Sequence, residues 1–307
     1  MHYRTLGRTG LKVSVIGLGS WQLGGEWGKD FTLAEVTAML RAAGACGINL
    51  IDTAECYGDH LAESLVGEAI AGERERWILA TKFGHRFHEA FKRDELFDPA
   101  TVRLQLEASL RALRTDYIDL YQFHSGKDHH FRSEGLWEML LAEKQKGKIR
   151  HLGISLSPNT NLYQTSRATQ VGAETVQVIY NRLDRAPEAE IFPACEKQRL
   201  GVLARVPLAS GLLSGKYAPG AEFPAGDVRE VWYKDGRDAR LAEVQRIATA
   251  EVPPGVSMAQ WALAWVLRHR AVTCVIPGCK SVDQVTTNAA AADLDIAQAG
   301  HPQASGE

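Results

Sequence analysis

Four polar residues of this chain form a set that can donate a proton to a carbonyl oxygen. Asp52, Lys82 and His124 each follow a short apolar run directly, and Tyr57 comes five residues after Asp52. A phenol is a poor proton donor near neutral pH, but an adjacent ammonium group favours the phenolate and lowers the phenol's pKa. A carboxylate keeps that ammonium charged, and an imidazole can orient a carbonyl oxygen. Together these groups would polarise a carbonyl and protonate the alkoxide as a hydride arrives.

Other reaction types find less support in the same residues. We expect no serine or cysteine nucleophile beside a base. A metal-dependent hydrolase is the alternative that the histidine-rich segment 124–130 suggests. Such a site needs ligands from several strand ends, and the first, fifth, sixth and eighth predicted strands offer none. We therefore expect no metal.

The elements that must position these residues are alternating strands and helices. Short apolar runs predict strands at residues 14–18, 48–51, 77–81, 117–123, 149–154, 175–179, 202–206 and 273–276. Helical spacing of apolar residues predicts helices at about 32–46, 61–71, 99–113, 133–146, 158–171, 187–199, 237–250, 257–269 and 281–292. A helix between two strands returns the chain to its starting side, so the strands should be parallel.

Eight such units in about 300 residues predict an α/β fold, a closed (β/α)8 TIM barrel. The main alternative is an open doubly wound sheet, which would carry a G-x-G-x-x-G run where the first helix begins. Gly17-Leu18-Gly19-Ser20-Trp21 breaks that pattern. In a barrel the chemistry sits at the carboxyl ends of the strands, so the four polar residues should meet at one mouth.

The two ends of the chain should lie outside this repeat. Residues 3–13 predict a β-hairpin that turns at Arg8-Thr9-Gly10, and the segment after about residue 294 reads as a polar tail. We find no linker, internal repeat or low-complexity tract that would divide the chain. Residues 1–307 are therefore predicted to form a single domain.

Composition excludes several other classes of protein. Of the 307 residues, 45% are hydrophobic and 23% charged, and the formal net charge is -2, which argues against disorder and against binding to nucleic acid or an anionic membrane. The longest apolar run, residues 261–267, is too short for a membrane span, which needs about 20 residues. The five cysteines form no C-x-x-C pair, and the N-terminus lacks the features of a signal peptide. We therefore expect a cytoplasmic protein.

Seven segments of the chain carry a resemblance to a known family. They are 47–58, 81–82, 123–124, 153–155, 177–181, 207–217 and 276–288, and they match in order the motifs of the aldo-keto reductases. The likeness runs from about residue 3 to residue 292. It implies a TIM barrel that binds NAD(P)H across the barrel mouth and reduces carbonyl groups.

By this resemblance the four polar residues take definite roles. Tyr57 would be the proton donor, Lys82 and Asp52 would tune it, and His124 would orient the carbonyl. A histidine at the last position implies carbonyl reduction, because relatives that reduce steroid double bonds carry glutamate there. The implied function is an NADPH-dependent carbonyl reductase that interconverts aldehydes or ketones and alcohols. Its partner would be a small carbonyl compound.

The resemblance also implies where the cofactor binds. Ser155 and Gln177 would hold the nicotinamide carboxamide, while the loop after the seventh strand and the last helix would hold the phosphates, as in many barrels. Lys280 and Gln284 would face the adenosine 2′-position, which implies NADPH with NADH also possible. The full implied set is Gly19, Ser20, Trp21, Asp52, Ser155, Gln177, Arg205, Pro207, Leu208, Gly211, Leu212, Ser214, Lys216, Arg229, Gly278, Lys280, Gln284 and Asn288.

Three departures from the family pattern stand out. Arg205 occupies a position where many relatives carry an aromatic residue, and Leu156 one where Asn or Arg is common. Residues 125–127 replace a bulky pair, which predicts a more mobile loop around Lys127, His129 and His130. Aromatic side chains that could wall an apolar substrate pocket are Trp21, Trp27, Phe83, Phe87 and Trp232.

A non-enzymatic alternative remains within the same family. The potassium-channel β subunits resemble reductases but act as regulatory partners, so the chain could be a redox-sensing NADPH-binding subunit with slow turnover. The intact pair of Tyr57 and His124 disfavours this alternative. The sequence predicts neither the physiological substrate nor the oligomeric state.

Overall fold

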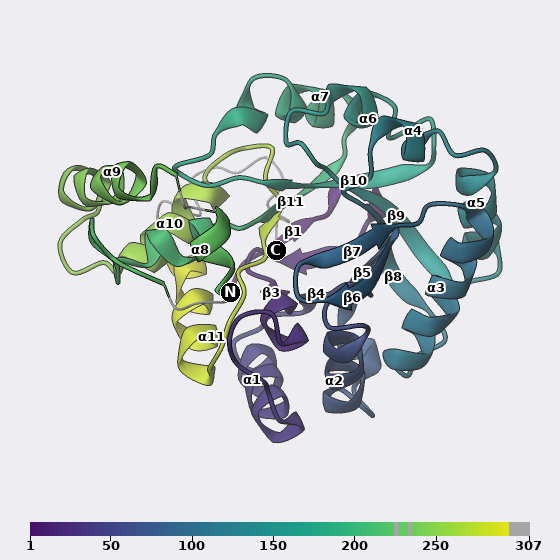
Figure 1. Cartoon of the computed structure of the whole chain (residues 1–307), viewed down its shortest axis with the longest axis horizontal. Helices are drawn as coiled ribbons and strands as arrows, with labels where there is room; N and C mark the ends of the chain where they lie inside the picture. Colours follow the sequence, from purple (N-terminus) through teal and green to yellow (C-terminus); the bar gives the residue numbers. More distant parts are fainter. Residues whose placement is uncertain (224–226, 233–234, 295–307) are drawn as a thin grey trace.

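Eight parallel strands form the centre of the computed structural model, which describes residues 1–223, 227–232 and 235–294, without the side chains of residues 231 and 232. In spatial order they are β3 (Leu18–Gly19), β4 (Leu50–Asp52), β5 (Ile78–Phe83), β8 (Ile118–His124), β9 (Ile149–Ser155), β10 (Ala173–Ile179), β11 (Gly201–Arg205) and β12 (Cys274–Val275). Each neighbouring pair is parallel. Figure 1 shows the helices arranged around the outside of these strands.

The last strand returns to the first and closes the barrel. Parallel bridges join Ile16 to Val275 and Gly19 to Gly278. The Gly19 N–H donates to the Pro277 carbonyl at 3.0 Å. A Cβ atom on Gly19 would lie 2.8 Å from the Ile276 carbonyl oxygen, so this close approach requires glycine. The predicted (β/α)8 fold is confirmed, although the first strand is only two residues long and not the predicted 14–18.

Helices follow the strands in the predicted alternation. They are α1 (Leu33–Ala45), α2 (Leu61–Ala69), α3 (Pro99–Ala112), α4 (Asp128–Phe131), α5 (Leu136–Gln145), α6 (Leu162–Ser166), α7 (Ile191–Gln198), α8 (Val228–Trp232), α9 (Arg237–Ala250), α10 (Met258–Leu267) and α11 (Val282–Ala289). Side-chain caps set several starts: Thr32 accepts from the Glu35 N–H, and Asp98 accepts from the Thr101 N–H just before Pro99.

The helix predicted at 158–171 is much shorter than expected. Only Leu162–Ser166 is helical, because the Asn161 side chain accepts from the Gln164 N–H and fixes the start four residues late. The greater mobility predicted for the loop around Lys127, His129 and His130 stays a prediction. The Gln164 amide donates to the Gly126 carbonyl and to Asp128, which ties this segment to α6.

The predicted N-terminal hairpin is confirmed. β1 (Tyr3–Thr5) pairs antiparallel with β2 (Lys12–Ser14), and the connecting turn ends at Gly10 with φ of 74°. Leu6 and Val13 from this hairpin pack with Leu50, Ala80, Leu120 and Leu203 from the inner face of the strands. The hairpin therefore plugs one end of the barrel and leaves the other end for the polar residues.

A second hairpin was not predicted. β6 (His85–Glu89) and β7 (Lys92–Glu95) are antiparallel and follow β5 directly. Their sequence is too polar to show the alternation of a half-buried strand. The hairpin is held instead by charge, since Arg93 donates to both carboxylate oxygens of Glu26 at 2.6 and 2.5 Å.

Two further sequence expectations concern the ends and the membrane. The polar tail after about residue 294 lies outside the described residues. Within the part that is described, every helix is too short or too polar to cross a bilayer.

Two glycines in helices allow a test of the packing around the barrel. A Cβ on Gly67 in α2 would lie 2.6 Å from backbone atoms of Leu113, whereas one on Gly44 in α1 would have its nearest neighbour, the Trp77 ring, at 3.6 Å. We expect Gly67→Ala to lower the free energy of unfolding by about 1–3 kcal/mol through overpacking. Gly44→Ala should leave it unchanged or raise it by up to ~1 kcal/mol, because alanine favours the helix. Urea unfolding followed by circular dichroism measures both, and equal effects would contradict the packing described.

Candidate active site

A buried ion pair lies at the open end of the barrel. Lys82, on β5, and Asp52, at the end of β4, are both almost fully buried, and Lys82 Nζ lies 2.6 Å from Asp52 Oδ1. The ammonium also donates to the Thr53 carbonyl at 2.6 Å and to Tyr57 Oη at 3.3 Å. Burial alone would lower the pKa of Lys82, but Asp52 and Tyr57 raise it, so the lysine is charged.

Tyr57 is held in the loop between β4 and α2 by close backbone packing. Gly58 has φ of 66°, and a Cβ on it would lie 2.5 Å from the Gly24 carbonyl oxygen. The Trp21 ring stacks on Tyr57 with ring centres 6.0 Å apart. The phenol oxygen accepts from Lys82, so its own O–H can donate into the pocket.

The acidity of Tyr57 differs from the expectation. Burial raises the pKa of the phenol to about 12, while Lys82 acts in the opposite direction and lowers it. The predicted influence of the ammonium therefore has the right sign, but the expectation of a net fall is wrong. Burial destabilises the phenolate more than the charge of Lys82 stabilises it.

His124 ends β8 and faces Tyr57, with ring centres 6.3 Å apart. Burial, together with His85, Lys82 and Arg205, holds its pKa well below the usual range. The imidazole is therefore neutral at pH 7. Its backbone carbonyl accepts a 2.7 Å hydrogen bond from His85 Nε2.

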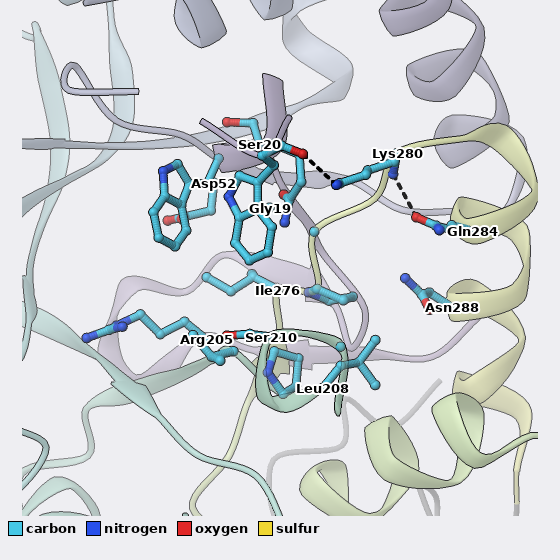
Figure 2. A pocket seen from close by; sticks show the side chains of 18 of the residues that line it. Gly19, Ser20, Asp52, Arg205, Leu208, Ser210, Ile276, Lys280, Gln284 and Asn288 are labelled. Atoms are coloured by element: carbon cyan, nitrogen blue, oxygen red, sulfur yellow. Dashed lines mark hydrogen bonds between the residues drawn. The ribbon is translucent and has the colours of Figure 1, made fainter. Parts of the chain in front are cut away.

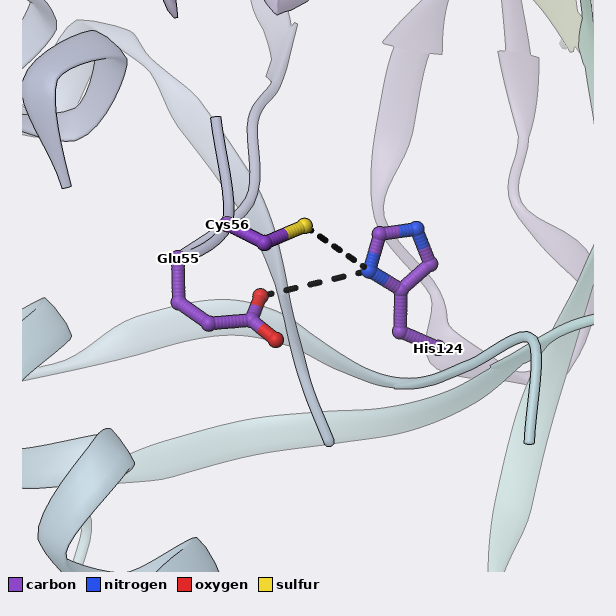
Figure 3. Close-up of side chains that lie close together, drawn as sticks. All are labelled: Glu55, Cys56 and His124. Carbon is purple, nitrogen blue, oxygen red and sulfur yellow. Dashed lines mark hydrogen bonds and ion pairs between the residues drawn. The ribbon is translucent and has the colours of Figure 1, made fainter. Parts of the chain in front are cut away.

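The other side of the His124 ring meets two groups that the sequence did not single out. Nδ1 lies 3.7 Å from Cys56 Sγ and 4.0 Å from Glu55 Oε2, and Figure 3 shows both directed at this nitrogen. Burial raises the pKa of Glu55 to about 8 and that of Cys56 well above its usual range. Glu55 Oε2 is buried with no hydrogen-bond partner among the described residues.

This contact bears on two expectations. A cysteine does lie beside a base, because Cys56 lies against His124, but the expectation that no such cysteine acts as a nucleophile stays a prediction. The raised pKa of Cys56 keeps its thiol protonated, so this residue is a poor nucleophile. Glu55, Cys56 and His124 offer three ligand-type atoms within 4.8 Å of one another. A metal would first have to displace the thiol proton, and the absence of a metal stays a prediction.

A polar layer inside the barrel supports Asp52. Its second oxygen, Oδ2, accepts from Gln122 at 3.1 Å and from Gln177 at 2.8 Å. Ser155 donates in turn to Gln177 Oε1 at 3.3 Å. Sequence reasoning missed Gln122, which lies two residues before His124 on β8. The pattern of alternating inward positions on that strand could have found it.

The unpredicted hairpin brings two further residues to the mouth, His85 and Arg93. The His85 N–H donates to Glu55 Oε1 at 2.9 Å. Arg93, besides its pair with Glu26, donates to the Cys56 carbonyl at 3.3 Å, and Glu26 also accepts from the Trp21 indole at 2.6 Å. These contacts fix the first loop, the hairpin and the segment before Tyr57 relative to one another.

A pocket of about 600 Å³ extends from Tyr57 and His124 to α11. The predicted site residues that line it are Gly19, Ser20, Trp21, Asp52, Tyr57, His124, Gln177, Arg205, Pro207, Leu208, Gly211, Ser214, Lys216, Arg229, Gly278, Lys280, Gln284 and Asn288. Lys82 lies beneath the pocket, Ser155 lies behind Gln177, and Leu212 is buried in an apolar cluster. Lining residues that the sequence did not indicate include His85, Arg93, Cys56, Ser125 and Gln22.

The loop after β11 forms one wall of the pocket. Val206, Ala209 and Ser210 have positive φ of 54°, 47° and 55°, and Gly211 has 93°. Such conformations are rare for residues with side chains, above all for a β-branched one, and they cluster at functional sites. Arg229 lies beside this loop and donates to both oxygens of Asp227 and to Tyr217 Oη at 2.8 Å.

The opposite end of the pocket is formed by the segment entering α11. The Lys280 N–H donates to Gln284 Oε1 at 2.8 Å, and Lys280 Nζ donates to the Trp27 carbonyl at 2.8 Å (Figure 2). Lys280 is half-buried, and burial followed by the Arg229 charge lowers its pKa. The Trp27 loop therefore covers part of this lysine.

Only part of the predicted aromatic wall lines the pocket. Trp21 and Trp27 do so, whereas Phe83 is fully buried in the core and Phe87 lies on the hairpin away from the lining. The side chain of Trp232 lies outside the described residues. The substrate end is thus more polar than the sequence suggested.

The residues present fit a nicotinamide dinucleotide. Lys216, Arg229 and Lys280 supply positive charge along one stretch of the pocket, where a diphosphate needs it. Gly211 has no side chain to fill the space beside Arg229, since a Cβ there would lie 3.5 Å from the guanidinium. Ser20 Oγ is buried without a hydrogen-bond partner in the described part of the chain, which leaves a donor for a ligand.

Glu55 gives a stability prediction with a definite sign. Its pKa is about 8 in the folded chain against 4.5 when unperturbed, so between these pH values the folded protein holds a proton that the unfolded chain has lost. The free energy of unfolding therefore falls as pH rises through this range. Glu55→Gln keeps an acceptor for the His85 N–H and removes the titration, so its stability relative to wild type should rise by roughly 2–4 kcal/mol from pH 5 to pH 9.

Urea unfolding at both pH values measures this difference. Glu89→Gln on the exposed part of β6 is the matched control and should show no such trend. The free energies of unfolding of wild type and Glu55→Gln could instead differ by the same amount at pH 5 and pH 9. That result would show that Glu55 is ionised in the folded protein at both pH values.

Comparison with known proteins agrees with this geometry. The sequence model of the aldo/keto reductase family matches residues 15–303. The chain is 33% identical over 296 residues to the uncharacterized oxidoreductase YqkF of Bacillus subtilis, covering 95% of this chain and 92% of that protein.

Two solved structures are similar over nearly the whole chain. Aldo-keto reductase AKR11C1 from Bacillus halodurans, in its holo form, is 32% identical with a TM-score of 0.80, covering 96% of this chain and 91% of that chain. An aldo-keto reductase from Klebsiella pneumoniae in complex with NADPH is 28% identical with a TM-score of 0.72, covering 96% and 90%. The chain therefore belongs to the aldo/keto reductase family, and it is an NAD(P)H-dependent oxidoreductase that acts on carbonyl groups.

Proposed function

We propose that the chain is an NADPH-dependent carbonyl reductase in which Tyr57 donates the proton. The observation that carries this proposal is the contact of one buried ammonium, Lys82, with both Asp52 and Tyr57 at the base of the pocket. A fixed, desolvated charge of this kind acts most strongly where negative charge develops during the reaction.

The proposed proton transfer follows from the hydrogen bonds. When bound, the nicotinamide cofactor supplies the hydride that reduces the carbonyl carbon. Tyr57 donates its proton to the carbonyl oxygen, and the phenolate that remains is stabilised by Lys82 at 3.3 Å. Asp52 holds Lys82 in place and keeps it charged. The reverse reaction, alcohol oxidation, starts from that phenolate.

His124 is proposed to orient the carbonyl. Since burial and the nearby cations keep it neutral, it can donate one N–H to the carbonyl oxygen without carrying a charge into the site. Donation from the ring side opposite Cys56 and Glu55 requires the proton on Nε2, and Nδ1 then faces the Cys56 thiol as an acceptor. The same intact geometry argues against the regulatory-subunit alternative.

NADPH is the proposed cofactor in preference to NADH. Lys280, with Arg229 nearby, is the charge that would meet a 2′-phosphate at the start of α11, whose dipole also favours an anion. A structurally similar reductase is in complex with NADPH, which supports the proposal. Asp283 in the first turn of α11 also lines the pocket and should moderate the preference.

Replacing Tyr57 with phenylalanine tests the proton donor. The hydroxyl is needed only when charge develops on the substrate oxygen, so kcat should fall by ~10²–10⁴-fold while NADPH still binds. Single-turnover NADPH oxidation with a generic aldehyde, alongside NADPH fluorescence titration, measures the two effects. Tyr163→Phe on α6 is the matched control and should behave as wild type. Wild-type turnover in Tyr57→Phe would sink the assignment.

Replacing Lys280 with alanine tests the cofactor preference. Wild type should prefer NADPH over NADH by roughly five- to thirty-fold, the size expected of a partly exposed charge contact, and the variant should lose most of this preference. The effect should fall on KM for NADPH, leave NADH nearly unchanged, and shrink as salt rises. Lys12→Ala, at the other end of the barrel, is the control. Equal weakening of both cofactors would mean that Lys280 acts by fixing Trp27 and not by meeting the phosphate.

A further inference from the structure

Arg205 is a pocket cation without a carboxylate partner in the described part of the chain. Two other cations near the reaction centre are matched, Lys82 by Asp52 and Arg93 by Glu26. Among the described residues, the guanidinium of Arg205, at the end of β11, donates one hydrogen bond, to the Leu156 carbonyl at 3.0 Å. Its Nε–H is buried without any partner that the structure describes.

An unpaired guanidinium in such a place is unusual. Arg205 is partly exposed to the pocket, but a guanidinium held in such a pocket usually meets an anion or several acceptors, because partial desolvation of its charge is costly. Burial lowers the pKa of Arg205, and the charges of Tyr57 and Asp52 act in the opposite direction. Glu55 does not compensate the charge, since its raised pKa leaves it protonated at pH 7. The reaction end of the pocket therefore carries one positive charge in excess.

The position of Arg205 ties this charge to the substrate end. Its field acts on Tyr57 and on His124, the two groups expected to meet the carbonyl oxygen. Figure 2 shows Arg205 at the end of the pocket opposite Lys280, Gln284 and Asn288. The cations that suit the phosphates of a dinucleotide lie at that other end. Arg205 is therefore placed to bind an anion other than the cofactor phosphates.

We propose that the preferred substrates of this reductase are carbonyl compounds that carry a carboxylate, and that Arg205 binds the carboxylate. The inference rests on the carbonyl reductase function proposed above. The planar guanidinium presents paired N–H donors that match the two oxygens of a carboxylate, and its flat face stays free to stack on a ring. The carboxylate serves only to bind the substrate, and its charge and bonds do not change. The hydride adds to the carbonyl carbon, and the Tyr57 proton adds to the carbonyl oxygen.

A matched pair of substrates tests the proposal, namely 4-oxobutanoate and its neutral methyl ester. Wild type should show a kcat/KM about 10- to 100-fold higher for the anion, the size expected of a charged hydrogen-bonded contact. Arg205→Gln should lose most of that ratio, and Arg205→Lys should keep part of it because the charge remains. Arg246→Gln, the same substitution on exposed α9, should leave the ratio unchanged.

Binding of succinate to the NADP⁺-loaded protein gives a readout that needs no turnover. Quenching of tryptophan fluorescence, to which Trp21 in the pocket contributes, should report an affinity that falls at least about tenfold in Arg205→Gln and not in Arg246→Gln. Equal succinate affinity in wild type and Arg205→Gln, or no preference of wild type for the anionic substrate, would overturn the proposal.

The outcomes also separate this inference from the function on which it rests. Turnover of the methyl ester without discrimination would leave the reductase function standing and refute the role of Arg205. Arg205→Gln could instead lose affinity for NADPH while the ratio of kcat/KM for the two substrates stays unchanged. That result would assign the guanidinium to the cofactor and would also refute its role in binding a substrate carboxylate. If neither aldehyde is reduced by wild type, the proposed function itself fails.

Discussion

The buried contact between Lys82 and Asp52 is the interaction on which the site depends. Removing two charges from water costs several kcal/mol for each ion, and this cost is offset only where the remaining donors and acceptors are satisfied. Here Lys82 reaches the Thr53 carbonyl and Tyr57, and the free oxygen of Asp52 accepts from Gln122 and Gln177. Strands β4, β5, β8 and β10 must therefore keep their register for the pair to exist, and closing the barrel supplies that constraint.

The same pair sets the charge balance of the surrounding pocket. Because Asp52 is committed to Lys82 and Glu26 to Arg93, neither carboxylate is left to neutralise Arg205. The excess charge is tolerated next to a neutral His124 and a protonated Glu55, whose pKa values are moved by burial in opposite directions. One arrangement of buried charges thus accounts for three features of the site. They are the proton donor Tyr57, the neutral imidazole of His124 and the unpaired cation Arg205.

The sequence predicts the barrel because that fold is repetitive and each βα unit carries its own apolar pattern and caps, as Thr32 and Asp98 show. It predicts that Asp52, Lys82 and His124 meet because all three end strands. The hairpin at 85–95 and the contact of Cys56 with His124 depend on packing between loops, which has no periodic signal. The net acidity of Tyr57 was misjudged for a related reason, since a spacing reveals the neighbouring ammonium but not the depth of burial. The single-domain prediction and the residue roles stay predictions.

The central claim is that Lys82 lowers the pKa of Tyr57, and this pKa can be measured at the residue itself. Tyr57 is replaced by 3-fluorotyrosine, a more acidic phenol, and its fluorine resonance is followed against pH in the wild-type background and in Lys82→Met. Since Lys82 lowers the phenol pKa and burial raises it, the titration midpoint should be higher in Lys82→Met while the circular dichroism spectrum is unchanged. A folded Lys82→Met protein in which residue 57 titrates at the same pH or lower would contradict the account.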